Sequence, residues 1–139
     1  MDLSNARLVA NIPAQDIERA MRWYQEKLGL RPTMDLGVAG QLYQSGGVYW
    51  LIYQTSAAGT GKHTVASWVV PSIDDAMSDM RSKGVVFEDY DMGDQGPTTQ
   101  DGVARGSDGG AVAWFKDSER NVLAITELPP GMAFPGGQA

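Results

Sequence analysis

The apolar positions of the chain follow one pattern twice, with the second copy 56 positions after the first. Each copy places a polar residue, Asp16 or Ser72, in front of apolar residues spaced three and four positions apart. Asp and Ser are preferred N-cap residues, and this spacing forms the apolar face of an amphipathic helix. The sequence therefore predicts two helices of the same design, which end near Gly29 and Gly84. Their apolar positions are Ile17, Ala20, Met21, Tyr24 and Leu28 in the first helix, and Ile73, Ala76, Met77 and Met80 in the second.

Shorter segments rich in β-branched and aromatic residues predict strands around each helix. We interpret each half as a β-α-β-β-β unit, which makes the chain a single α+β domain of two tandem units. The first unit spans residues 6–55 and the second spans 63–128, within one domain of residues 1–139 whose residues 129–139 form a loose C-terminal tail. The predicted strands are residues 7–12, 31–36, 40–45 and 48–54 in the first half, and 64–70, 85–90, 103–106, 111–116 and 122–127 in the second.

Composition narrows the range of functions. The 139 residues carry a net charge of −6 without a basic cluster, which argues against nucleic acid as a partner because such binding neutralises phosphates. No apolar run is long enough to span a bilayer and no signal-peptide pattern opens the chain, so we expect a cytoplasmic protein with no membrane partner. The absence of cysteine excludes disulfides, thiolate metal sites and a cysteine nucleophile.

Three segments, in this order, resemble the vicinal oxygen chelate superfamily of glyoxalases, bleomycin-resistance proteins and extradiol dioxygenases. They are residues 12–30, with Ile-Pro-Ala-Gln-Asp leading into the first helix, residues 70–76, and residues 113–123, with Asp-Ser-Glu-Arg-Asn between two strands. Together they extend over most of residues 7–128. The resemblance implies that the two units form a curved mixed sheet, a half-barrel, around a pocket, and that the protein is a homodimer.

The same resemblance locates the positions at which metal-dependent members of the superfamily place His, Glu or Gln ligands. These positions correspond to Val9, Trp50, Val65 and Ala124. Val, Trp and Ala side chains offer no lone pair to a divalent cation. We therefore expect no metal and no other cofactor, and no activity of the usual metal-dependent kind.

Alternation along the strands predicts which other residues line the pocket, because successive side chains point to opposite faces of a sheet. A surface that is apolar with a few uncharged hydrogen-bonding groups is typical of a small-molecule site. Trp50 would either stack on a planar ligand or fill the core. The expected ligand-binding residues are Val9, Asn11, Trp50, Ile52, Gln54, Val65, Ser67, Ala124 and Thr126.

Two functional hypotheses follow. The first is a metal-free protein that binds an organic ligand, aromatic or cationic, in the cleft between the units, similar to the drug-sequestering resistance proteins of the superfamily. The second is an enzyme of the superfamily, a lyase, isomerase or hydrolase on a small carbonyl compound, with an atypical site. His63 is either a general base or ligand in that site or an exposed residue at a junction. The polar loop 91–102 is either a lid or disordered.

Overall fold

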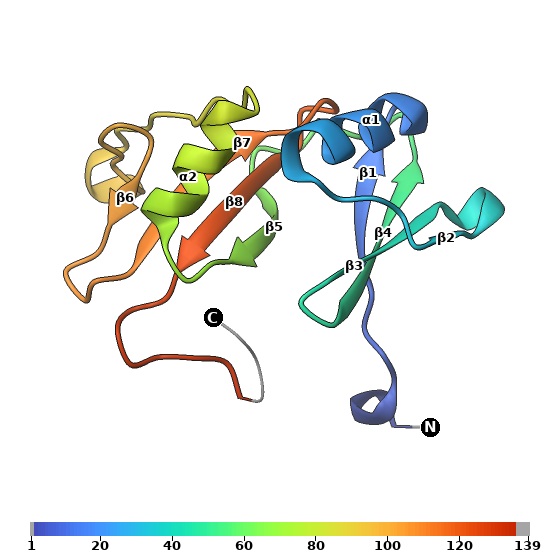
Figure 1. The fold of residues 1–139 in the computed structure, drawn as a ribbon, viewed down its shortest axis with the longest axis horizontal. Coiled ribbons are helices and arrows are strands. Elements are labelled where there is room, and N and C mark those ends of the chain that lie inside the picture. Colours follow the sequence, from blue (N-terminus) through green and yellow to red (C-terminus); the bar gives the residue numbers. More distant parts are fainter. Residues whose placement is uncertain (1, 136–139) are drawn as a thin grey trace.

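The computed structural model describes residues 2–135, which form two helices and eight strands (Figure 1). Three short 3₁₀ turns lie at Leu3–Asn5, Gly37–Ala39 and Gly93–Gln95. Neither helix in this part of the chain is long and apolar enough to cross a membrane. In chain order, the elements are β1 (Ala10–Ala14), α1 (Ile17–Leu28), β2 (Met34–Asp35), β3 (Gln41–Ser45), β4 (Val48–Gln54), β5 (Thr64–Val69), α2 (Ile73–Ser82), β6 (Ala104–Arg105), β7 (Ala111–Lys116) and β8 (Val122–Glu127).

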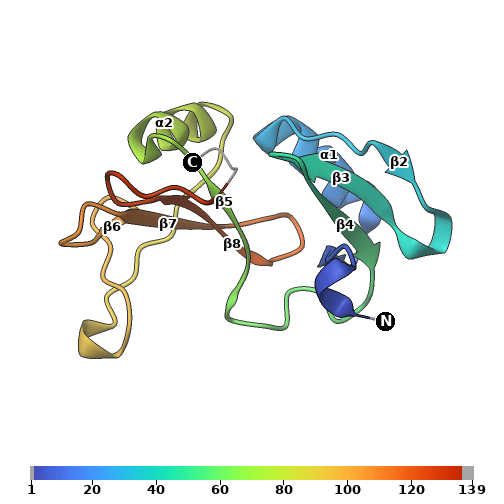
Figure 2. The same cartoon turned by 90° about the horizontal axis from the view of Figure 1, so that it is seen from below.

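The strands form two four-stranded sheets of the same topology, ordered β1-β4-β3-β2 and β5-β8-β7-β6. In each sheet the first strand of the unit pairs in parallel with the last, and the other pairs are antiparallel. The two units lie side by side, each with a helix on one face of its sheet, as Figures 1 and 2 show. This confirms the predicted α+β fold, in which two tandem β-α-β-β-β units form an open, curved sheet.

The two helices begin at the residues that the repeat predicts. The Asp16 side chain accepts a hydrogen bond from the backbone N–H of Arg19 at 3.1 Å, and the Ser72 side chain accepts one from that of Asp75 at 3.2 Å. Both caps satisfy a backbone donor that has no partner within its helix. At the other end of α1, Gly29 has a left-handed backbone with φ of 70°, a conformation that glycine adopts without steric cost.

Four of the predicted strands differ by more than one residue from those in the structure, and one of them, predicted at 103–106, is reduced to Ala104–Arg105. The predicted strand at 7–12 is shifted to Ala10–Ala14, and Pro13 lies within it because β1 is an edge strand that pairs only with β4. The strand predicted at 31–36 is reduced to Met34–Asp35. The strand predicted at 85–90 is wrong, because this segment makes only an isolated bridge from Phe87 to Phe115. Residues 129–135 of the predicted tail contain no strand or helix, and residues 136–139 lie outside the described part of the chain.

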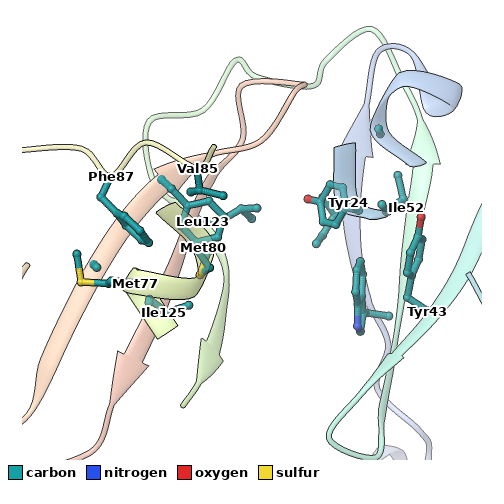
Figure 3. Close-up of a cluster of buried hydrophobic side chains, with 14 of the residues drawn as sticks. Tyr24, Tyr43, Ile52, Met77, Met80, Val85, Phe87, Leu123 and Ile125 are labelled. Carbon is teal, nitrogen blue, oxygen red and sulfur yellow. The ribbon is translucent and has the colours of Figure 1, made fainter. Parts of the chain in front are cut away.

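The hydrophobic core lies between each helix and its sheet, and it continues from one unit to the other. Figure 3 shows Tyr24, Tyr43 and Ile52 packed beneath α1, and a second group that includes Met77, Met80 and Leu123 packed beneath α2. Two aromatic pairs join the units. Trp23 of α1 stacks on Phe115 of β7 with ring centroids 6.3 Å apart, and Trp50 of β4 meets Trp68 of β5 edge to face at 5.9 Å.

Candidate functional site

A groove of about 310 Å³ lies between the two units, and we call it the inter-unit groove. Its lining includes Ser45, Val48 and Trp50 from the first unit and Ser67, Trp68 and Val69 from the second. Within residues 2–135, no charged side chain lines it, and most of its surface is apolar. Its volume lies at the lower end of the range that small-molecule sites occupy, about 300–1,000 Å³. The groove therefore has the size and chemistry of a site for a small, largely apolar molecule.

One hydroxyl fixes both tryptophans of this groove. Ser45 Oγ accepts a hydrogen bond from Trp50 Nε1 at 3.1 Å and another from Trp68 Nε1 at 3.3 Å. Ser45 is the last residue of β3, and the hairpin to β4 brings it beside Trp50, while Trp68 reaches it from the neighbouring unit. Because both indoles are held by the same acceptor, their orientation is set before any ligand arrives, which lowers the entropic cost of binding.

The structure places Trp50 and Ile52 on a different face of the sheet from the one that the sequence predicted. The register of β4 aligns Trp50 with Ala10 and with Tyr43, which puts its ring under α1. There it stacks on Tyr43 at 4.4 Å and lies 5.9 Å from Tyr24, and only 6% of its surface is exposed. Trp50 is therefore a core residue with one edge at the inter-unit groove, and the expectation that Trp50 and Ile52 share a face with Asn11 is wrong.

Four of the remaining seven predicted residues lie on two corresponding faces of the sheets. Ser67, Ala124 and Thr126 do share a face, the one opposite α2, which we call the open face of the second unit. On this face Ser67 Oγ and Thr126 Oγ1 lie 2.9 Å apart in a hydrogen bond. Asn11 lies on the corresponding open face of the first unit, in register with Leu51 of β4.

The other three predicted residues do not join these groups. Val9 precedes β1. Gln54 is exposed at the end of β4 and lies on the same face of the sheet as Trp50. Val65 lies where the register between β5 and β8 shifts, and it packs against the core. Of the nine predicted residues, only Trp50 and Ser67 line the inter-unit groove. Whether any of the nine binds a ligand stays a prediction.

The sequence interpretation missed the tryptophan on the open face of the second unit. Trp114 of β7 aligns with Ala124, and its Nε1 donates to Thr64 Oγ1 at 3.1 Å. The ring of Tyr90 packs edge to face against it at 5.7 Å. The alternation of β7 contained this signal, because Ala113 and Phe115 are buried on the α2 side and Trp114 between them must point away.

The residues at the superfamily's ligand positions do not fit a metal ion. Val9, Val65 and Ala124 carry no donor atom, and on β4 the residue that shares a face with Asn11 is Leu51, which carries none either. Among residues 2–135, no group of three or more His, Cys, Asp or Glu side chains is arranged to hold a metal. His63 is exposed at the start of β5 and packs beside Gly61 of the linker.

A buried polar cluster in the turn between β7 and β8, residues 117–121, connects the second unit to the first. Asp117 Oδ2 accepts hydrogen bonds from the Tyr24 hydroxyl at 2.7 Å and from Asn121 Nδ2 at 2.8 Å. Asn121 Nδ2 also donates to the Pro13 carbonyl at 2.8 Å. Burial raises the pKa of Asp117, while the hydrogen bonds from Tyr24 and Asn121 act in the opposite direction. These contacts fix the two units against each other and hence the width of the groove.

The second acid of this turn, Glu119, reaches the N-terminus of α1. Its Oε1 accepts from the backbone N–H of Asp16 at 2.8 Å, and its two oxygens bind the guanidinium of Arg19 at 2.8 and 3.0 Å. Burial favours the protonated acid, but the hydrogen bonds from Arg19, Asp16 and Ser118 outweigh it and lower the pKa of Glu119 to about 2. Glu119 is therefore an anion that ties the second unit to the first.

Comparison with solved structures identifies the fold. A glyoxalase/bleomycin-resistance protein from Catenulispora acidiphila matches with a TM-score of 0.61 and 22% identity, over 88% of this chain and 98% of the other. Lactoylglutathione lyase from Agrobacterium tumefaciens matches with a TM-score of 0.63 and 13% identity, over 88% and 93%. The fosfomycin resistance protein FosX from Listeria monocytogenes matches with a TM-score of 0.62 and 12% identity, over 89% and 91%.

Sequence comparison adds nothing to this match. No protein-family model matches the chain. No curated protein matches it significantly. The resemblance found in the sequence is therefore confirmed as a shared fold, and the proteins that share it include one named as a glyoxalase/bleomycin-resistance protein and one named as a lyase. A shared fold does not by itself determine function.

Proposed function

We propose that this protein, which has the fold of the glyoxalase and bleomycin-resistance proteins, binds a small organic ligand in the inter-unit groove without a metal. The observation that carries the proposal is the pair of indoles, Trp50 and Trp68, held by Ser45 at the wall of an uncharged groove. Trp50 presents only an edge, whereas Trp68 is half-buried and can offer its ring. An indole ring contacts planar aromatic molecules over a large area, and its face attracts cations. An aromatic ligand, neutral or cationic, fits this wall.

The polar groups of the groove support the same ligand class. The Ser45 oxygen receives two N–H groups, and its own hydroxyl hydrogen can still be donated to a ligand. Ser67 of the second unit offers another hydroxyl, which can still accept from a ligand besides its hydrogen bond with Thr126 Oγ1. A mainly apolar surface with two such groups orients a small molecule without demanding a charge.

Quenching of tryptophan fluorescence by a panel of aromatic and cationic metabolites tests the proposal. Trp68→Phe should reduce both the quenching and the affinity, because it makes one aromatic wall smaller and removes one of the two N–H groups that donate to Ser45. The matched control is Trp114→Phe, because Trp114 is also a half-buried tryptophan but lies away from the groove. If Trp114→Phe weakens binding and Trp68→Phe does not, the ligand binds on the open face of the second unit and the groove proposal is wrong.

Metal independence needs a separate measurement. We expect protein purified without a chelator to contain less than one divalent ion per chain, because the aligned side chains offer no donor atoms. A stoichiometric, tightly bound divalent ion would overturn the metal-free part of the proposal. It would leave the groove proposal to be judged by the fluorescence experiment alone.

The alternative is an enzyme of the same fold. It is favoured by the similarity to a protein named as a lyase, lactoylglutathione lyase from Agrobacterium tumefaciens. In this case turnover of a small carbonyl compound should be detectable. His63→Ala should then abolish turnover if His63 is the general base, and unchanged turnover would exclude that role.

We also propose that the protein is a cytoplasmic homodimer. In the described part of the chain, β1 and β5 each pair on one side only, so each leaves a row of backbone groups that another chain can cover. The segment before β1 extends away from the sheets, as Figure 1 shows, and its Leu3 and Leu8 side chains are 79% and 89% exposed. Light scattering with size exclusion should give twice the mass of one chain, and a monomer at micromolar concentration would contradict this part.

A further inference from the structure

We propose that a second cavity, on the helix side of the molecule, binds a small amphipathic carboxylate with an apolar body and one anionic head. The cavity has a volume of about 230 Å³ and lies between the C-terminal end of α1 and the helix α2. We call it the helix-side cavity. The proposal is independent of the function proposed for the inter-unit groove and concerns a different site.

The floor of the helix-side cavity is apolar and well packed. It is made by Trp68, Phe115 and Ile125 of the second sheet, with Leu28 and Met80 contributed by the two helices. Phe115 and Ile125 are almost fully buried, at 0% and 3% exposure. The part of the floor that water reaches therefore comes from the partly buried Leu28, Trp68 and Val70. A hydrocarbon chain or an aromatic ring placed there would remove apolar surface from water on both sides of the contact, which favours binding.

The mouth of the cavity carries two lysines and one acid. Lys27 comes from the last turn of α1, while Lys83 and Asp79 come from the end of α2. Lys83 Nζ binds Asp79 Oδ2 at 3.0 Å, whereas Lys27 has no carboxylate within 4.0 Å among residues 2–135. The mouth therefore carries one excess positive charge in a chain whose net charge is −6.

Lys27 lies close to the C-terminal end of α2. Lys27 Nζ lies beside Gly84 and would be 2.8 Å from a Cβ atom added there, which places the ammonium at the C-terminal end of α2. The negative end of the α2 dipole favours a cation at this position. A carboxylate head at the mouth would lie on a surface lined by two lysines, Lys27 from α1 and Lys83 from the C-cap of α2.

An anion would displace little in order to bind. The Lys83–Asp79 pair is formed by side chains that are 39% and 64% exposed, and ion pairs of this kind contribute little to stability. Neutral amphiphiles would gain only the contact with the floor, and cationic ones would be repelled by the lysines. The combination of apolar floor and cationic mouth therefore selects an anionic head on an apolar body.

The size of the cavity suits a short ligand. Its volume equals that of about eight water molecules at roughly 30 Å³ each, which is enough for a medium-chain or aryl-alkyl acid. Octanoate is therefore a suitable probe. Octanol and octyltrimethylammonium, which have the same chain with a neutral or a cationic head, are the matched comparisons.

Isothermal titration of the full chain with octanoate tests the proposal. We expect saturable binding at one site, with octanol and octyltrimethylammonium bound at least tenfold more weakly. Lys27→Gln and Lys83→Gln should each weaken octanoate binding about fivefold, because each removes one exposed ion pair with the head. Lys62→Gln, at an exposed lysine of the linker, is the matched control and should leave the affinity unchanged.

A second variant separates the helix-side cavity from the inter-unit groove, because Trp68 lines both. Ala76→Leu enlarges a side chain that lines the helix-side cavity but not the inter-unit groove, and it should abolish octanoate binding. An aromatic ligand in the groove should still quench the fluorescence of Trp50 and Trp68. Circular dichroism verifies that each variant is folded. The proposal would be overturned by any of three results: octanol binding as tight as octanoate, unaltered octanoate affinity in both lysine variants, or no saturable binding. If Ala76→Leu does not fold, the two lysine variants decide the question.

Discussion

Arg19 and Glu119 are 100 positions apart in the sequence and meet in a two-point ion pair, with Nε to Oε2 at 2.8 Å and Nη2 to Oε1 at 3.0 Å. The Glu119 side chain is fully buried, whereas that of Arg19 is 47% exposed. This pair joins α1 of the first unit to the turn between β7 and β8 of the second. Together with the neighbouring Asp117 and Asn121, it makes the arrangement of the two units depend on polar contacts as well as on the shared core.

Removing the guanidinium should therefore destabilise the whole chain. We expect Arg19→Gln to lower the free energy of unfolding by about 1–2 kcal/mol, because Glu119 would keep a buried charge with fewer partners, while the exposure of Arg19 limits the loss. Urea unfolding followed by circular dichroism measures this change. The matched control is Arg22→Gln on the same helix, since Arg22 is exposed and forms no ion pair within residues 2–135. Equal stability of the two variants would show that the pair contributes nothing.

The same contact should give the protein a specific dependence on pH. The pKa of Glu119 falls from 4.5 to about 2 on folding, because the hydrogen bonds it accepts outweigh the effect of burial. A lowered folded pKa means that the unfolded chain binds the proton more readily, so this stabilisation is complete above pH 4.5 and is lost as the pH falls towards 2. Asp117, whose pKa burial raises, acts with the opposite sign in the acid range.

Measuring unfolding free energy in urea between pH 2 and 7 tests this sign. The wild-type chain should lose more stability than Glu119→Gln between pH 4.5 and 2, because the variant has no carboxylate to protonate at this position. Parallel curves for the two proteins would show that Glu119 is not held as an anion by the folded state.

The helices and the inner strands were predictable because their sequence patterns are local. The caps at Asp16 and Ser72 and the bounds of β4, β7 and β8 agree with the prediction. The face of β4 was not predictable, because residues 48–53 are apolar or aromatic at every position and no alternation marks the buried side. Only the register with β1, which aligns Trp50 with Ala10, decides that this ring lies under α1.

The inter-unit groove and the polar cluster beside it could not be predicted from the sequence for a related reason. The sequence around Asp117, Glu119 and Asn121 is typical of a solvent-exposed turn between two strands. In the structure the three residues are only 6%, 2% and 3% exposed, because the first unit packs over them. Trp68 is likewise placed by a contact with Ser45, a residue of the other unit. Contacts between units depend on how the units dock, and no local spacing in the sequence encodes that arrangement.

Two buried tyrosines in the first unit should respond in opposite ways to the loss of their hydroxyl. Both are fully buried, with ring centroids 6.2 Å apart. The Tyr43 hydroxyl has no hydrogen-bond partner within the described chain, and burial raises its pKa to about 12, whereas the Tyr24 hydroxyl donates to Asp117. We expect Tyr43→Phe to keep or raise the free energy of unfolding, by up to about 1 kcal/mol, and Tyr24→Phe to lower it by about 1.5–3 kcal/mol.

Each tyrosine variant serves as the control for the other, because both remove one oxygen from the same aromatic cluster. Urea unfolding at pH 7 gives both values under the same conditions. A loss of more than about 1 kcal/mol in Tyr43→Phe would mean that its hydroxyl has a bound partner in solution, such as a buried water.

The turn that carries Glu119 also contains a residue under backbone strain. Arg120 has φ of 67°, a left-handed conformation that costs a residue other than glycine about 1 kcal/mol or more. Arg120→Gly should relieve this strain, and although glycine gains freedom in the unfolded chain, we expect a net increase of about 0.5 kcal/mol in the free energy of unfolding. Arg120→Ala removes the same side chain but keeps the strain, so it should show no gain. If both variants lose stability equally, the packing of the Arg120 side chain beside Gly59 of the linker stabilises the turn more than the strained backbone destabilises it.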